Sequence, residues 1–147
     1  MNKVDISKAI LLLLSLSCVL TYFASCSSNM TDKDEIIKLF RNKERVFLDA
    51  ANNNDFSKVS KIYGVQNVDT WEDYIDIQCG GAGFGSSTHY YGIFYSENDD
   101  LCAVRLGAPG DQLKEHENGF LYTEENGDNR YYVEPLGNHF FYYEAHF

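Results

Sequence analysis

Tyr74-Ile75-Asp76-Ile77-Gln78-Cys79 is the stretch that decides the fold, because apolar and polar residues alternate along it with the period of a β-strand. Before it, apolar residues recur at helical spacing, and after it the period of two returns in several further segments. We expect strands over residues 74–79, 89–95, 102–106, 119–123, 131–134 and 139–147. Short turns join them and leave no room for parallel crossovers, so the pattern predicts an antiparallel meander of about five to six strands.

The segment before these strands predicts one long helix. Thr31 is a good N-cap, and the apolar residues of one face recur at helical spacing, namely Ile36, Phe40, Phe47 and Ala51. Asn52-Asn53-Asn54 ends the helix. A short second helix is plausible over residues 55–63, although 59–65 also fits an extended strand. The expected fold class is therefore α+β, with the long helix packed on one face of the meander.

The first residues have the pattern of an export signal. Lys3 and Lys8 precede an almost continuous apolar run over residues 9–24, which is shorter than the roughly 20 residues of a membrane span. The run ends at Ala24-Ser25-Cys26, which resembles the lipobox of bacterial lipoproteins, where the signal is cut before an acylated cysteine; Phe23 stands where leucine is usual. An ordinary secretory signal or an uncleaved anchor are the alternatives.

This interpretation divides the chain into three parts. We expect residues 1–25 to be a lipoprotein signal peptide, 26–30 to be the lipidated Cys26 and a tether, and 31–147 to be a single globular domain. The protein is then extracytoplasmic and anchored to the cell membrane by a lipid.

The mature part is similar to a set of small, uncharacterised bacterial lipoproteins. The resemblance rests on Ala24-Ser25-Cys26, on the charged helix, on Tyr90-Tyr91-Gly92-Ile93-Phe94-Tyr95-Ser96 and on the tail Phe141-Tyr142-Tyr143-Glu144-Ala145. It implies an envelope location and an α+β layout, and it implies no activity.

Charge is distributed unevenly along the 147 residues, whose formal net charge is −10. Residues 62–147 hold three Lys and Arg against fifteen Asp and Glu, whereas seven basic residues lie between Lys33 and Lys61. This balance argues against nucleic-acid binding, which needs clustered cations. A partner of the sheet is expected to be cationic, and the helical segment is expected to face the bilayer.

Aromatic residues are the most distinctive feature of the C-terminal part. Adjacent aromatics on a strand point to opposite faces, so a helix on one face leaves tyrosines on the other. We expect a ligand face for a protein, peptide or glycan, made of Tyr91, Tyr95, Tyr132 and Tyr142. Tyr132 or Tyr142, or both, should then be more than about a third exposed, away from the helix.

No motif indicates catalysis, a cofactor or a metal. The glycines of residues 80–85 are followed by a strand and include no lysine, so they do not fit a phosphate loop. The four histidines lack metal-ligand spacing, and the pairs Asp99-Asp100 and Glu124-Glu125 are typical of solvated turns. We therefore expect a non-catalytic, membrane-tethered interaction domain.

Two other functions remain open. One is an immunity or inhibitor protein that masks a basic partner with its acidic part. The other is a small hydrolase that uses His89 or His139.

Cys79 and Cys102 are expected to be unpaired. In a meander, Cys79 would end one strand and Cys102 would begin the next strand but one. With a strand between them, their Cα atoms would lie farther apart than the roughly 7 Å that a disulfide spans.

Overall fold

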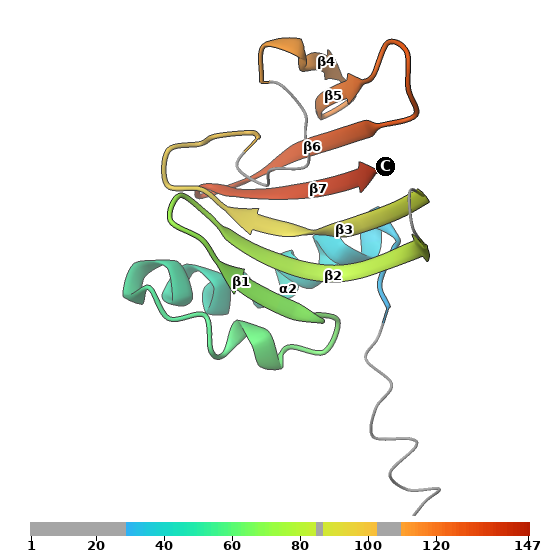
Figure 1. Ribbon diagram of the computed structural model, residues 1–147. Coiled ribbons are helices and arrows are strands. Elements are labelled where there is room, and N and C mark those ends of the chain that lie inside the picture. The colour runs from blue at the N-terminus through green and yellow to red at the C-terminus, as the bar shows by residue number, and fades with distance from the viewer. Residues whose placement is uncertain (1–28, 85–86, 103–109) are drawn as a thin grey trace, which may run out of the picture.

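The computed structural model describes residues 29–84, 87–102 and 110–147 (Figure 1). Within them it contains one α-helix, α2 (Lys33–Asn53), and two 3-10 turns, η1 (Val59–Lys61) and η2 (Gly110–Gln112). The strands form a single antiparallel sheet of seven: β1 (Asn67–Thr70), β2 (Ile75–Phe84), β3 (Ser87–Tyr95), β4 (Lys114–His116), β5 (Gly119–Thr123), β6 (Arg130–Gly137) and β7 (Phe140–His146).

The strand order is β1-β2-β3-β7-β6-β5-β4. Two runs of hairpins, β1 to β3 and β4 to β7, meet where β7 pairs with β3, with Ile93 opposite Tyr142. β7 pairs on its other side with β6, where Val133 lies opposite Tyr143. The last strand of the chain is therefore the central strand of the sheet (Figure 1).

The expected fold class, α+β with a long helix on a meander of about five to six strands, is wrong. The described chain is mostly sheet, with seven strands in an order that is not sequential. The strands missed are β1 and β4, short edge strands whose residues are mostly exposed and therefore show no apolar alternation. A further strand was expected over residues 102–106. Cys102 lies in a turn, and residues 103–106 fall outside the described residues.

The second helix expected over residues 55–63 is reduced to the turn η1. Only Phe56 and Val59 are buried in this short segment, which leaves too little apolar surface to hold a longer helix. Gly64 follows with a φ of 106°, a left-handed conformation that glycine adopts without strain.

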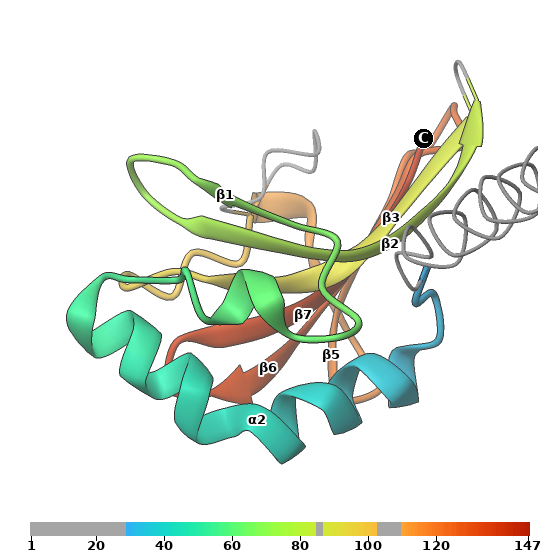
Figure 2. The ribbon, with the colours of Figure 1, turned by 90° about the horizontal axis from the view of Figure 1, so that it is seen from below.

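The long helix α2 forms because both of its ends are capped. The side chain of Asp32, rather than Thr31, accepts a hydrogen bond of 3.0 Å from the backbone N–H of Glu35. Asn54 ends the helix in the left-handed conformation, with a φ of 49°. The helix lies under one face of the sheet (Figure 2) and buries there Ile36, Leu39, Phe40, Phe47 and Ala50.

Both faces of the sheet carry a core. On the α2 side, aliphatic residues of β2 and β3 pack with Phe140 and with the helix. On the opposite side a second cluster surrounds Phe94, Tyr131, Val133, Phe141 and Tyr143. Leu101 and Leu113, which both lie in the connection from β3 to β4, pack against this second cluster. The sheet is thus covered on both faces by its own chain.

The start of the described chain is attached to β2. The backbone N–H of Met30 donates to the carbonyl of Cys79 over 3.1 Å, and Asn29 Oδ1 accepts from the N–H of Gly81 over 2.9 Å. Gly80 lies between these contacts, and a Cβ there would collide with the Met30 carbonyl, so only glycine allows the close approach. The glycine-rich segment belongs to a strand and holds the N-terminal segment in place.

Cys79 and Cys102 are both free, as the sequence predicted. The geometry differs from the expectation, since Cys102 follows β3 in a turn and does not begin a strand. Burial and the nearby charge of Asp76 raise the pKa of Cys79 to about 12. Its thiol is therefore a small buried apolar group at neutral pH.

Among residues 29–84, 87–102 and 110–147, no helix combines the length and the apolar composition that crossing a membrane requires.

Candidate functional site

The tyrosine face expected from the sequence does not exist. Tyr132 is 5% exposed and Tyr142 is 0% exposed, and both belong to the core on the α2 side of the sheet. Tyr91 and Tyr95 are half-buried against the same core. The prediction that Tyr132 or Tyr142 faces away from the helix and is largely exposed is therefore wrong. The physical reason is that α2 covers the face on which all four lie.

The hydroxyl groups of the two buried tyrosines have carboxylate partners on their own strands. Tyr132 donates to Glu134 Oε2 over 2.7 Å, and Tyr142 donates to Glu144 Oε2 over 3.4 Å. Residues two apart on a strand share a face, so the repeated Tyr-x-Glu spacing is the sequence signal for these pairs. Tyrosine can be buried in this way because its one polar group is satisfied.

Lys33 completes the group around Tyr132. Its Nζ lies 2.6 Å from Glu134 Oε2, donates to the Tyr132 hydroxyl over 3.0 Å and sits 4.6 Å from the centre of that ring. Partial burial lowers the pKa of Lys33, but its hydrogen bonds to Glu134 and Tyr132 and the charge of Glu134 outweigh burial and raise it. This group ties the first turn of α2 to β6 and has a structural role.

Tyrosines on the opposite face are satisfied in the same manner. The Tyr131 hydroxyl donates to the carbonyl of Leu101 over 2.8 Å, and the Tyr143 hydroxyl donates to Asp76 Oδ1 over 2.9 Å. Burial of Asp76 is the main reason that its pKa is raised to about 6, against the lowering effect of the Tyr143 hydrogen bond.

Replacing Asp76 with asparagine should stabilise the protein at pH 7 by about 2–3 kcal/mol. The folded state holds the Asp76 proton more tightly than the unfolded state does, so this carboxyl contributes stability at about pH 4 that is lost as the pH rises through 6. Asparagine keeps an acceptor for Tyr143 without the buried charge. Urea unfolding at pH 4 and pH 7 measures the change, with the exposed Asp128→Asn as control. A lower stability of Asp76→Asn at pH 7 would contradict the assignment.

The two histidines considered for a hydrolase lie at opposite ends of β7. His139 precedes β7 and has its Nδ1 2.9 Å from Asp99 Oδ1, with both side chains exposed. His89 pairs with His146 at the other end, and their rings lie 4.2 Å apart. Seven residues of strand separate the two positions, roughly 23 Å, so they do not form one site. No metal-binding group of His, Cys, Asp and Glu occurs in the described part of the chain.

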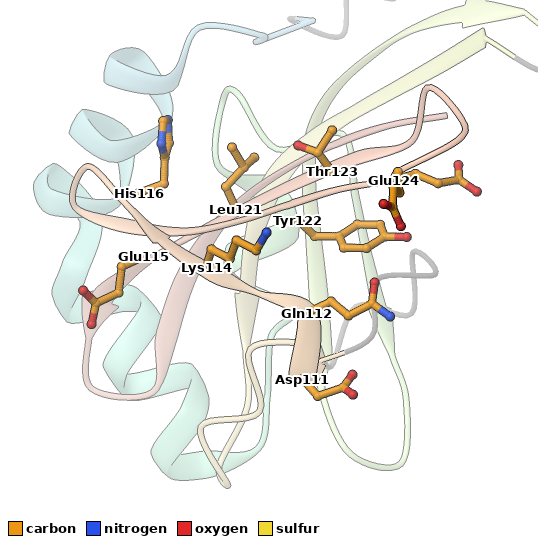
Figure 3. A pocket seen from close by; sticks show the side chains of 10 residues that line it. Asp111, Gln112, Lys114, Glu115, His116, Leu121, Tyr122, Thr123 and Glu124 are labelled. Atoms are coloured by element: carbon orange, nitrogen blue, oxygen red, sulfur yellow. The ribbon is translucent and has the colours of Figure 1, made fainter.

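An acidic groove lies at the β4–β5 edge of the sheet (Figure 3). Its volume is about 700 Å³. It forms because η2 brings Asp111 and Gln112 beside the hairpin, while the turn after β5 brings Glu124 and Glu125 to the other side. We call this the acidic groove; its charged and aromatic lining consists of Asp111, Lys114, Glu115, His116, Tyr122, Glu124 and Glu125.

The acidic groove is suited to a cation. Four carboxylates and one ammonium line it, which leaves it negatively charged at neutral pH. Figure 3 shows Tyr122 and Gln112 projecting toward the same side, with Lys114 directed toward Tyr122. The Tyr122 ring is half-buried against the second cluster and lines the acidic groove together with the carboxylates. An aromatic ring at such a place is suited to contact an alkyl chain or a cation.

Sequence reasoning missed the acidic groove, although it noted Glu124-Glu125 as a pair of turn acids. Asp111 lies in the same groove as Glu124 and Glu125 only because the chain from η2 to β5 folds back, and no local sequence pattern specifies that path.

Comparison of the chain with protein-family models, with curated proteins and with solved structures finds no match. The assignment of a function therefore rests on the chain's own residues.

Proposed function

We propose that this protein is a membrane-tethered, extracytoplasmic lipoprotein whose domain is a non-catalytic binding module for a cationic segment of a partner protein. The acidic groove carries the proposal. It combines a concave surface, an excess of carboxylates and an aromatic ring, which together favour lysine or arginine side chains.

The wider distribution of charge supports this proposal. Residues 62–147 carry twelve more acidic than basic residues, so the field around the sheet attracts cations toward the acidic groove. Complementary charge of this kind speeds association and excludes acidic partners.

The leader and the attachment of the N-terminal segment support the tether. Cys26 is the proposed acylation site, and three residues further on Asn29 is already held by Gly81. β2 and β4 are five strand positions apart in the sheet, roughly 24 Å at the usual strand spacing. The acidic groove thus lies several strands away from the segment of β2 that holds Asn29, which leaves it accessible to a soluble partner.

Binding of a cationic peptide tests the acidic groove. We expect a lysine octapeptide to bind the full-length protein in detergent, with an affinity that falls as salt rises. The double variant Glu124→Gln/Glu125→Gln should bind several-fold more weakly, since an exposed ion pair contributes about 0.2–1 kcal/mol. The matched control, Glu72→Gln/Glu97→Gln, removes the same charge from exposed sites outside the acidic groove. Titration calorimetry compares the three proteins.

Equal weakening by both double variants would show that net charge alone attracts the peptide, and would overturn the acidic groove as the site. The immunity-type alternative uses the same groove, and a captured basic enzyme that loses its activity on binding would assign the protein to that class.

A further inference from the structure

A second groove has the opposite charge and lies where the tether joins the domain. It runs between α2 and the η1 segment, has a volume of about 1030 Å³, and includes Asn29 and Met30 in its lining. We call it the basic groove. Four exposed lysines surround it, accompanied by one lining carboxylate, Glu35; the lysines are Lys38, Lys43, Lys58 and Lys61.

The floor of the basic groove is apolar. Met30, Leu39, Val46 and Ile62 line it beneath the lysines. Tyr63 lines the groove and is 80% exposed, whereas every other tyrosine that the structure describes is buried or half-buried. Lysines around apolar residues and an exposed tyrosine match the headgroup region of a membrane, where aromatic rings lie at the interface and cations meet phosphates.

The length of the tether restricts what can reach the basic groove. Asn29 is held by Gly81 and by the side chain of Gln66, which donates over 3.2 Å. Two residues, Ser27 and Ser28, lie between it and Cys26, so at most roughly 11 Å of extended chain joins the two. This is comparable with the Debye length at physiological salt, about 8 Å, so the groove that Asn29 lines is held near the lipid surface.

We propose that the basic groove docks on the anionic phospholipid headgroups of the membrane that carries the acyl anchor. The proposal rests on the acylation of Cys26 proposed above. The four lysines contact the lipid phosphates, Tyr63 enters the interface, and the sheet points outward. The acidic groove, at the far edge of the sheet, is then presented away from the membrane (Figure 1).

Lysine protection tests this orientation in the full-length acylated protein. The protein is reconstituted into vesicles of phosphatidylcholine, or of phosphatidylcholine with about one third phosphatidylglycerol, and its lysines are acetylated and read by mass spectrometry. We expect Lys38, Lys43, Lys58 and Lys61 to be acetylated at least about threefold more slowly on the anionic vesicles. Lys114, in the acidic groove, is the internal control and should react at the same rate on both.

A matched pair of variants sharpens the test. Lys58→Gln/Lys61→Gln should remove the protection of Lys38 and Lys43, because each lysine near an anionic surface changes the equilibrium constant of docking by about fivefold. Lys114→Gln should leave that protection unchanged.

Several results would overturn the proposal. One is acetylation of the four lysines at the same rate on both kinds of vesicle, and another is protection of Lys114 to the same extent as the four lysines. A third is protection of the four lysines by inorganic phosphate on vesicles of pure phosphatidylcholine, which would assign the basic groove to a soluble anion. The intact mass separates the two levels of the argument. A protein without an acyl group refutes the tether and the docking that depends on it, whereas an acylated protein with unprotected lysines refutes the docking alone.

Discussion

Replacing Phe140 with alanine is expected to lower the free energy of unfolding by about 3–5 kcal/mol. Phe140 is 0% exposed and begins the central strand β7. Its ring lies 5.3 Å from that of Phe40, 5.7 Å from that of Phe47 and 5.0 Å from that of Tyr95. Truncation leaves a cavity where α2 packs against β3 and β7. Urea unfolding followed by far-ultraviolet circular dichroism measures the loss.

Phe84→Ala is the matched control for this prediction. Phe84 is 96% exposed at the end of β2, so the same substitution removes no buried contact and should change the stability by less than about 0.5 kcal/mol. Similar losses in the two variants would mean that Phe140 does not occupy the core described here.

Replacing Cys26 with alanine is expected to abolish stable membrane attachment. Acyl chains contribute about 0.8 kcal/mol for each buried methylene group, and the reversible contacts of the basic groove with lipid headgroups do not replace that contribution. The variant should move from the membrane fraction to the soluble fraction after alkaline washing, and globomycin should no longer affect its processing. Cys18→Ala, which changes the other leader cysteine, should remain acylated and membrane-bound. Persistence of Cys26→Ala in washed membranes would identify the leader as an uncleaved anchor.

The sequence predicted the segments that have a strong local pattern. The long helix and the strands β2, β3, β5, β6 and β7 follow from periods of 3.6 and two over several residues. The pairing of β3 with β7 could not be predicted in this way, because Ile93 and Tyr142 lie opposite each other across a long separation in sequence. Local turns specify neighbours along the chain and do not specify which strand joins two runs of hairpins.

The candidate site was predicted less well than the fold. The expectation of exposed tyrosines placed Tyr132 and Tyr142 on the face away from the helix, whereas both lie on the face that α2 covers. The other face is not open either, because Leu101 and Leu113 pack against its cluster. The same expectation overlooked that Glu134 and Glu144 could satisfy tyrosine hydroxyls in the core. The acidic groove and the basic groove each combine segments that meet only after folding. The distribution of charge along the sequence therefore indicated which part of the chain is acidic and which is basic, but it did not indicate where the grooves lie.

The position of β7 has a consequence for the order of events in folding. The strand that pairs with both β3 and β6 is the last of the described strands to be synthesised. Until residue 146 is available, β3 and β6 each lack their inner neighbour, and the aromatic cluster of Phe40, Phe47 and Phe140 lacks its central ring. Contacts of such long sequence separation close slowly, because loop entropy is lost before they form. Nascent chains are therefore expected to stay open to proteases until β7 emerges.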